Sequence, residues 1–187
     1  MSDIQRKWDA KYLGQTTRPI AAEVLIQNQH LLPKAGTALD VACGRGGNAL
    51  LLANLGLQVT ARDISPVAIQ QLQQFSSAVN AQVCDVVSQT PEAEQYDVVV
   101  VSYFLDRALA ASIVNALKPG GLLFYQTWCQ QKTADRGPSN PEYLLADNEL
   151  LQMFSGLRPR FYREEALLGD VSRGQRDIAM LVAERVG

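Results

Sequence analysis

The sequence predicts an α/β fold: a doubly wound, mostly parallel sheet of seven strands with helices on both faces, in a single domain over residues 1–187. Short apolar segments alternate with helical patterns along most of the chain, which is typical of βαβ units. Segment 96–102, Tyr-Asp-Val-Val-Val-Val-Ser, is an almost unbroken apolar run, as expected for a central parallel strand buried on both faces. No long helix separates the last two predicted strands, so we expect an antiparallel C-terminal hairpin.

Turn and capping residues set the predicted element boundaries. Pro19 stands at the first turn of a predicted helix over 20–32, where its missing N–H costs nothing. Gly56 is expected to end the following helix, and Ser65 with Pro66 gives an N-cap followed by proline at the first helical position. The predicted strands are 36–42, 58–62, 81–84, 96–102, 122–127, 157–163 and 177–184, the other helices are 47–55, 66–75, 106–117 and 147–154, and a tight turn occupies 118–121.

Composition and charge narrow the possible functions. Lysine and arginine number 17 against 19 acidic residues, so the formal charge of −2 predicts no nucleic-acid or membrane partner. No uncharged apolar run approaches the roughly 20 residues that span a bilayer, and the first ten residues lack the apolar region of a signal peptide. Cys43, Cys84 and Cys129 form no CxxC pair or metal-ligand cluster. We therefore expect a cytoplasmic protein without a metal, either a monomer or a homodimer.

The first predicted strand leads into a glycine-rich loop. Gly44-x-Gly46-x-x-Ala49 fits the dinucleotide-binding fingerprint, and Asp63 follows at about the 20-residue spacing of a ribose-binding acid. An NAD-dependent oxidoreductase is therefore one interpretation, and a merely tight strand-to-helix turn is another. In either case the ligand of a doubly wound sheet is expected beyond the carboxyl ends of its strands.

Three carboxylates favour a different nucleoside ligand. Asp40 lies at the end of the first strand, where it would repel a pyrophosphate but suit a cationic ammonium group. Asp63 closes the second strand and can accept both hydroxyls of a ribose, while Asp85 follows the third and can accept from an exocyclic adenine amine. The N–H of Val86 can donate to a ring nitrogen. An adenosine with a zwitterionic amino-acid tail fits these acids better than a dinucleotide, although each acid can also be a solvated loop residue.

Five elements follow one another between residues 36 and 127: Asp40-x-x-Cys-Gly-x-Gly, Asp63, Asp85, Tyr96-Asp97 and Leu117-Lys-Pro-Gly-Gly121. In this order they resemble the successive motifs of class I S-adenosylmethionine-dependent methyltransferases. The resemblance implies a Rossmann-like fold, S-adenosylmethionine as cofactor and S-adenosylhomocysteine as product. The family usually has glycine where this chain has Ala42, which adds one methyl group against the cofactor's tail. The implied cofactor-binding residues are Asp40, Ala42, Gly44, Gly46, Asn48, Asp63, Ile64, Asp85, Val86 and Ser102.

The flanks narrow the resemblance. Trp8-Asp-Ala-Lys-Tyr12, together with 137–141, 148–151 and 161–165, is similar to the small-molecule subgroup that includes the tellurite-resistance (TehB-like) methyltransferases. In that subgroup the N-terminal segment, here residues 1–17, folds over the cofactor as a lid. The resemblance places Trp8 and Tyr12 at the cofactor, although aromatic residues four apart also lie on one helix face and can anchor a terminus. The subgroup tends to carry a histidine near the last strands, whereas the only histidine here is His30, ahead of the first strand.

The chemistry of a sulfonium methyl donor guides the choice of acceptor. Its leaving group is a neutral thioether, so the protein mainly aligns the reactants and needs a base only for a protonated nucleophile. The fourth strand ends in Ser102-Tyr103-Phe104 and lacks the Asn/Asp-Pro-Pro-Tyr sequence of amino-methylating enzymes. We expect a small molecule with a soft nucleophile (a thiol, selenium or tellurium species), positioned by Tyr103, Arg173 and Arg176 beside a substrate-side loop over 129–143. A non-catalytic cofactor-binding protein is the alternative.

Overall fold

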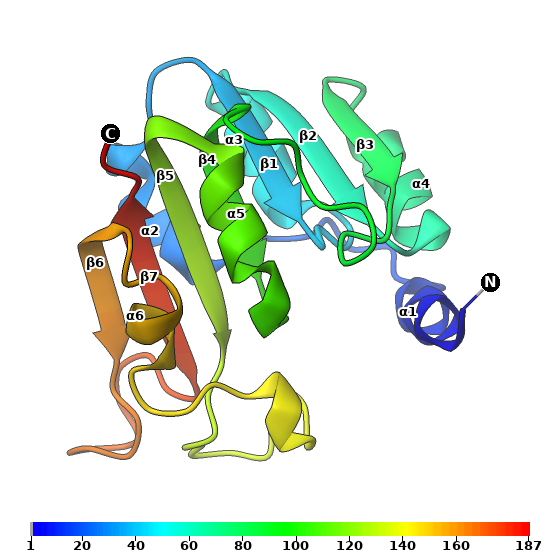
Figure 1. Ribbon diagram of the computed structural model, residues 1–187. Coiled ribbons are helices and arrows are strands. Elements are labelled where there is room, and N and C mark those ends of the chain that lie inside the picture. The colour runs from blue at the N-terminus through cyan, green and yellow to red at the C-terminus, as the bar shows by residue number, and fades with distance from the viewer. Residues whose placement is uncertain (1) are drawn as a thin grey trace.

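The computed structural model describes residues 2–187 and contains a seven-stranded sheet with the order β3-β2-β1-β4-β5-β7-β6. Strands β1 to β5 pair in parallel, whereas β7 pairs antiparallel with both β5 and β6. The predicted doubly wound sheet with its antiparallel C-terminal pair is confirmed (Figure 1). The strands are β1 Thr37–Val41, β2 Gln58–Asp63, β3 Val79–Val83, β4 Tyr96–Ser102, β5 Leu117–Trp128, β6 Arg158–Glu164 and β7 Ile178–Glu184.

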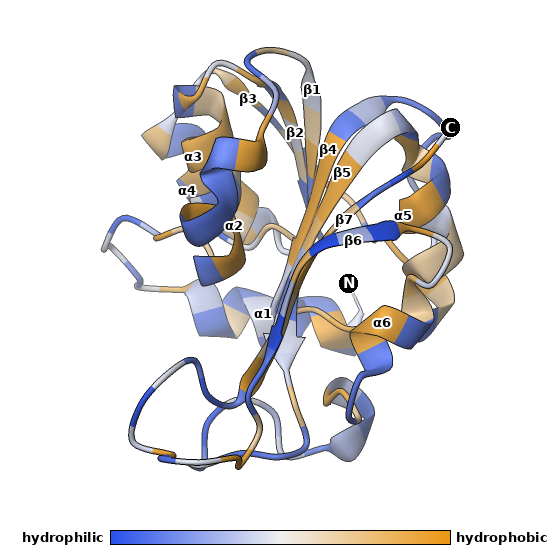
Figure 2. Ribbon diagram, turned by 90° about the vertical axis from the view of Figure 1, so that its left-hand side faces the viewer, coloured by the Kyte–Doolittle hydropathy of each residue, from blue (hydrophilic) through white to orange (hydrophobic). Residues whose placement is uncertain are grey.

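Helices cover both faces of the sheet, as predicted. Figure 2 shows α2, α3 and α4 on one side and α5 and α6 on the other. Strand β4 explains this arrangement, because Val98 and Val100 pack into the hydrophobic cluster beneath the first group while Val99 and Val101 pack beneath the second. The helices are α1 Asp3–Tyr12, α2 Glu23–Asn28, α3 Gly47–Asn54, α4 Pro66–Phe75, α5 Ala110–Ala116 and α6 Glu149–Met153, with 3₁₀ turns η1 Gln29–Leu31, η2 Arg107–Leu109 and η3 Pro141–Tyr143.

The prediction of a helix over 20–32 is wrong at its start, because α2 begins only at Glu23. The N–H groups of Ala22 and Val24 donate to the side-chain oxygens of Asn48 and Gln126, each at 2.8 Å. The buried side-chain amides of Asn48 and Gln126 thus satisfy the backbone N–H groups just before and within the first turn of α2. With a helix that started earlier, these N–H groups would need other partners. The α4 cap, in contrast, is as predicted, with the Ser65 hydroxyl accepting from the N–H of Ala68 at 3.1 Å.

Three further boundaries differ from the prediction. Strand β3 starts two residues early, the helix predicted from 106 begins as the 3₁₀ turn η2, and segment 118–121 is part of β5 rather than a separate turn. Lys118 Nζ lies 2.8 Å from Asp97 Oδ2, which also accepts the N–H of Thr37 at 2.7 Å. The Tyr96-Asp97 and Lys118-Pro-Gly-Gly segments therefore join the starts of β1, β4 and β5 at the amino edge of the sheet.

The carboxyl edge of the sheet gathers the segments that matter for function. In Figure 1 strands β1 to β4 all point to this edge, and α1 and the loops at 129–145 and 165–177 lie along it. Within residues 2–187, no helix is both long enough and apolar enough to cross a membrane.

Candidate functional site

Asp40 is the most deeply buried acid at the carboxyl edge, with no exposed surface. Its Oδ2 accepts the N–H of Ala49 at 3.0 Å, and its Oδ1 accepts from Asn48 Nδ2 at 3.3 Å. Burial raises the pKa of Asp40 to about 7 in spite of these hydrogen bonds. Among residues 2–187 no lysine or arginine forms an ion pair with it. A buried carboxylate with this environment suits a cationic ligand group.

Asn48 connects the glycine loop to its surroundings. Its Nδ2 donates to the Ser102 hydroxyl at 2.8 Å, and its Oδ1 accepts the N–H of Ala22. Three of the predicted cofactor-binding residues, Asp40, Asn48 and Ser102, thus form one hydrogen-bonded group that joins β1, α3 and β4. Ala42, also predicted, stands at φ 51°, the left-handed region that favours glycine.

The two predicted loop glycines have different surroundings. Gly46 stands at φ 80°, the left-handed region that favours glycine, and a β-carbon there would also collide with the Leu72 side chain of α4. Gly44 donates its N–H to Asp63 Oδ2 at 2.7 Å, and a β-carbon there would lie 2.7 Å from the Tyr12 hydroxyl oxygen. Gly44 is therefore the glycine whose open side meets the N-terminal helix.

Asp63 is the last residue of β2 and Asp85 lies just after the neighbouring strand β3, as predicted. Asp63 is almost fully buried, its Oδ1 accepts the N–H of Ser65 at 2.8 Å, and burial raises its pKa. Ile64, the residue between Asp63 and Ser65, is half-buried. Asp85 is also half-buried and accepts the N–H of Val87 at 3.1 Å. The Val86 side chain packs in the core, which leaves its backbone as the part available to a ligand.

Helix α1 lies against α4 beside the glycine loop. Trp8 and Tyr12 stack with ring centroids 5.8 Å apart, and burial raises the pKa of Tyr12. The carboxylate of Asp9 accepts from the Ser65 hydroxyl at 2.5 Å, and Gln71 Nε2 donates to the carbonyl of Tyr12 at 3.0 Å. The predicted lid segment, of which residue 1 lies outside the described residues, therefore covers the loop through Tyr12. Both the lid and the anchor interpretations fit this docking.

Arg45 makes contacts that the sequence did not predict. It is buried, and its guanidinium donates to the carbonyl of Thr17 at 2.6 Å and to Gln15 Oε1 at 3.2 Å. The guanidinium carbon also lies 5.7 Å from the Phe75 ring centroid, within range of a cation–π contact. Arg45 of the glycine loop thus binds the segment that follows α1. The signal in the sequence was an arginine between Gly44 and Gly46, where a charged side chain needs partners.

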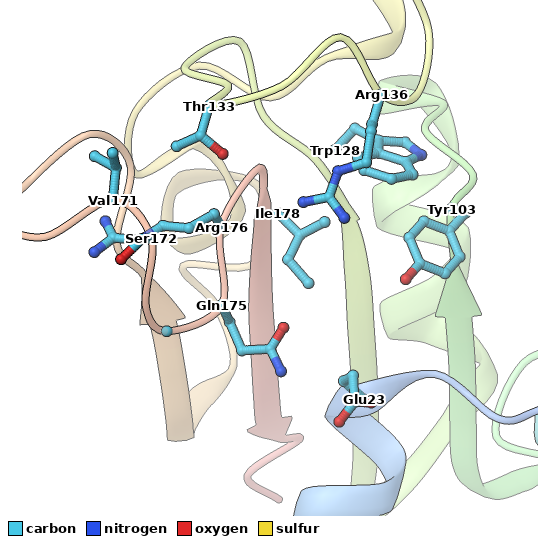
Figure 3. Close-up of a pocket in the computed structure, with 11 residues that line it drawn as sticks. Glu23, Tyr103, Trp128, Thr133, Arg136, Val171, Ser172, Gln175, Arg176 and Ile178 are labelled. Carbon is cyan, nitrogen blue, oxygen red and sulfur yellow. The ribbon is translucent and has the colours of Figure 1, made fainter.

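A cavity of about 280 Å³ opens at the ends of β4 and β5, beside the hydrogen-bonded group of Asp40, Asn48 and Ser102 (Figure 3). Tyr103 and Trp128 form an aromatic wall with ring centroids 5.2 Å apart. Two of its lining residues directly follow residues that hydrogen-bond to Asn48: Tyr103 follows Ser102, and Glu23 follows Ala22. Its lining residues are Glu23, Tyr103, Trp128, Thr133, Arg136, Val171, Ser172, Gly174, Gln175, Arg176 and Ile178.

The structure places the predicted substrate-side residues in different roles. Tyr103 lines the cavity, whereas Arg173 is exposed and lies outside its wall. Arg176 lines the wall, but its guanidinium is turned away in Figure 3. That guanidinium donates to the carbonyl oxygens of Glu165, Ala166, Leu168, Asp170 and Arg173 and so holds the β6–β7 loop.

Arg136, from the predicted loop over 129–143, instead directs its guanidinium into the cavity (Figure 3). Its Nε donates to Oδ2 of buried Asp177 at 3.0 Å, and the N–H and hydroxyl of Thr133 donate to Oδ1. Burial alone would raise the pKa of Asp177, but the hydrogen bonds from Thr133 and Arg136 outweigh it and lower that pKa. An ionised Asp177 therefore fixes the loop as one wall of the cavity. Sequence reasoning missed this pair because its members are 41 residues apart.

Comparison with known proteins identifies the family. A family model for a methyltransferase domain matches residues 12–159. The chain belongs to this family. The resemblance to class I S-adenosylmethionine-dependent methyltransferases is thereby confirmed, and the oxidoreductase interpretation loses its support. The ubiquinone biosynthesis O-methyltransferase of Serratia proteamaculans (strain 568) is 33% identical over 137 residues, which cover 65% of this chain and 56% of the relative. The matched part thus spans about half of that curated relative.

Solved structures share the fold. TehB from Haemophilus influenzae superposes with a TM-score of 0.70 at 21% identity, covering 97% of this chain and 66% of TehB. The [4+2]-cyclase SpnF superposes with a TM-score of 0.72 at 18% identity, covering 98% of this chain and 96% of the cyclase. A protein named as a cyclase shares the architecture, so the fold alone does not specify the reaction.

Proposed function

We propose that this chain binds S-adenosylmethionine at the carboxyl ends of β1 to β4 and transfers its methyl group to a small molecule held in the aromatic-walled cavity. The supporting observation is the continuity between the two parts of the site. Ser102 and Ala22 belong to the hydrogen-bonded group around Asp40 and Asn48, and the next residue of each, Tyr103 and Glu23, lines the cavity. A methyl donor beside the first group would face an acceptor in the second.

The residues around the loop fit the cofactor. The Asp40 carboxylate, buried and without an ion pair among the described residues, would take the ammonium group of the amino-acid tail, and Asp63 the ribose hydroxyls. Asp85 and the backbone of Val86 would hold the adenine. The cofactor supplies a methyl group on a positively charged sulfur. Tyr12, lying against Gly44, would exclude water from that region, which is the purpose of a lid.

The cavity wall supports a soft nucleophile as acceptor. Within residues 2–187 no histidine lines it, and His30 is exposed on η1. Of the described residues that form the wall, Glu23 alone carries a carboxylate, and a carboxylate is a weak base for a phenol or an alcohol. A thiolate, selenol or tellurium species is already anionic near neutral pH and needs little help from a base. The name of the Serratia relative points to an oxygen acceptor, so a catechol is the appropriate competing substrate.

The test is formation of S-adenosylhomocysteine by the full chain with a panel of thiols, selenite, tellurite and catechol. We expect turnover with at least one soft nucleophile at a kcat/KM well above that for catechol. Faster turnover of catechol would reject the acceptor class, and no turnover with any acceptor despite cofactor binding would favour the non-catalytic alternative. The control variant is Asp135→Asn, because Asp135 is exposed and lies outside the cavity wall. This variant should methylate the acceptor at the wild-type rate.

A further inference from the structure

The buried amide of Gln126 has a fixed orientation. This side chain has no exposed surface and ends between α2 and the β4 end. Its Oε1 accepts the backbone N–H of Val24 at 2.8 Å. A backbone N–H can only donate, so the oxygen of the amide must face Val24 and its nitrogen must face the other way.

This orientation determines what the Tyr103 hydroxyl can do. Gln126 Nε2 lies 2.7 Å from the Tyr103 oxygen, and because an amide NH₂ only donates, the tyrosine oxygen is the acceptor in that bond. The hydroxyl proton of Tyr103 must then point elsewhere. Burial raises the pKa of Tyr103, so the group keeps its proton. In Figure 3 the hydroxyl faces the interior of the cavity, where it is a hydrogen-bond donor.

A second donor meets the same space from another element. The Arg136 guanidinium points into the cavity (Figure 3). Its Nε and Nη2 both bond Asp177, and among the described residues its Nη1 has no hydrogen-bond partner. Glu23 lies at the other end of the cavity in Figure 3, next in sequence to Ala22 of the Asp40–Asn48 group. The cavity therefore has a donor end, formed by Tyr103 and Arg136, and an acidic end at Glu23.

We infer that the cavity selects acceptors that carry a carboxylate, which would be held between the Tyr103 hydroxyl and the Arg136 guanidinium. This inference rests on the proposed function in taking the molecule bound in the cavity to be the methyl acceptor. The aromatic wall of Tyr103 and Trp128 suits a flat body between the two ends. Gln126 is then a positioning residue that acts through Tyr103.

Benzoate and benzamide are the matched probes, since both are planar and only benzoate carries the charge. Each is titrated by calorimetry into the full chain, the Tyr103→Phe and Gln126→Glu variants, and the control Tyr143→Phe, an exposed tyrosine outside the cavity wall. We expect wild type and control to prefer benzoate, and Tyr103→Phe to lower benzoate affinity about tenfold with little effect on benzamide, because one hydrogen bond to a charged group is lost. In the Gln126→Glu variant a carboxylate oxygen would accept the Tyr103 proton, so the same preference for benzoate should be reduced.

Equal affinity for the two probes in wild type, or an unchanged benzoate affinity in Tyr103→Phe, would overturn the inference. Equal losses for both probes in the Tyr103 variant would also overturn it, because they would indicate a structural effect. A parallel titration with S-adenosylhomocysteine separates this inference from the proposed function. Cofactor binding without benzoate preference rejects the carboxylate site alone, and benzoate preference without cofactor binding supports the carboxylate site and rejects the methyl-transfer proposal.

Discussion

Replacing Asp40 by asparagine should change how the stability of the protein depends on pH. Burial raises the pKa of Asp40 from 3.8 to about 7, so between these values the folded state holds a proton that the unfolded chain has lost. The stability contributed by this group therefore falls as pH rises from about 4 to about 7 and is constant above. Each tenfold difference in proton affinity is worth about 1.4 kcal/mol, so ionisation of Asp40 costs about 4 kcal/mol of the free energy of unfolding.

Urea denaturation of wild type and Asp40→Asn between pH 4 and 8 measures this cost. Asparagine keeps an oxygen for the N–H of Ala49 but carries no charge, so the variant should gain about 4 kcal/mol relative to wild type across this pH range. The exposed-site variant Asp135→Asn serves as the control and should run parallel to wild type. A constant difference between Asp40→Asn and wild type across the range would refute the reasoning. The same carboxylate should make S-adenosylhomocysteine bind more tightly to wild type as pH rises from 6 to 8, because an ammonium group favours the ionised acid.

Three further changes have defined outcomes. Ala42→Gly should raise the free energy of unfolding by about 1 kcal/mol, because φ 51° strains alanine, and should leave S-adenosylhomocysteine affinity equal or higher; lower stability in urea would contradict this. Asp63→Ala should weaken that affinity by about 2 kcal/mol or more in calorimetry, and unchanged affinity in a folded variant would exclude the ribose placement. Deleting residues 1–12 should leave a folded domain with weak cofactor binding, and in a Trp128→Phe background Trp8 fluorescence should shift on adding S-adenosylhomocysteine; a flat signal at calorimetric saturation would make the segment a static anchor.

Local signals in the sequence were sufficient for most of the fold. The Ser65-Pro66 cap and the valine run of β4 depend on neighbouring residues and on burial of whole strands, and both appear as predicted. The start of α2 was missed because it is set by the side chains of Asn48 and Gln126, which lie 26 and 102 residues from the N–H groups they satisfy. No local propensity can report a hydrogen bond of that separation.

The candidate site divides in the same way. Asp40, Asp63 and Asp85 could be placed from sequence because acids at the ends of parallel strands meet at one edge of the sheet. The close approach of Gly46 to the Leu72 side chain could not be predicted, because Leu72 belongs to another helix. Arg176 was expected to face the substrate, but the carbonyl groups of its own loop hold its guanidinium. Only the folded chain shows that the guanidinium of Arg136, rather than that of Arg176, points into the cavity.

Calorimetric titration of S-adenosylhomocysteine into the full chain tests cofactor binding, on which the proposed function depends, most directly. We expect saturable binding to one site, and at a ligand concentration 100 times the dissociation constant an increase of about 2.7 kcal/mol in the free energy of unfolding. Absence of saturable binding by a chain that urea denaturation shows to be folded would contradict cofactor binding at this edge of the sheet.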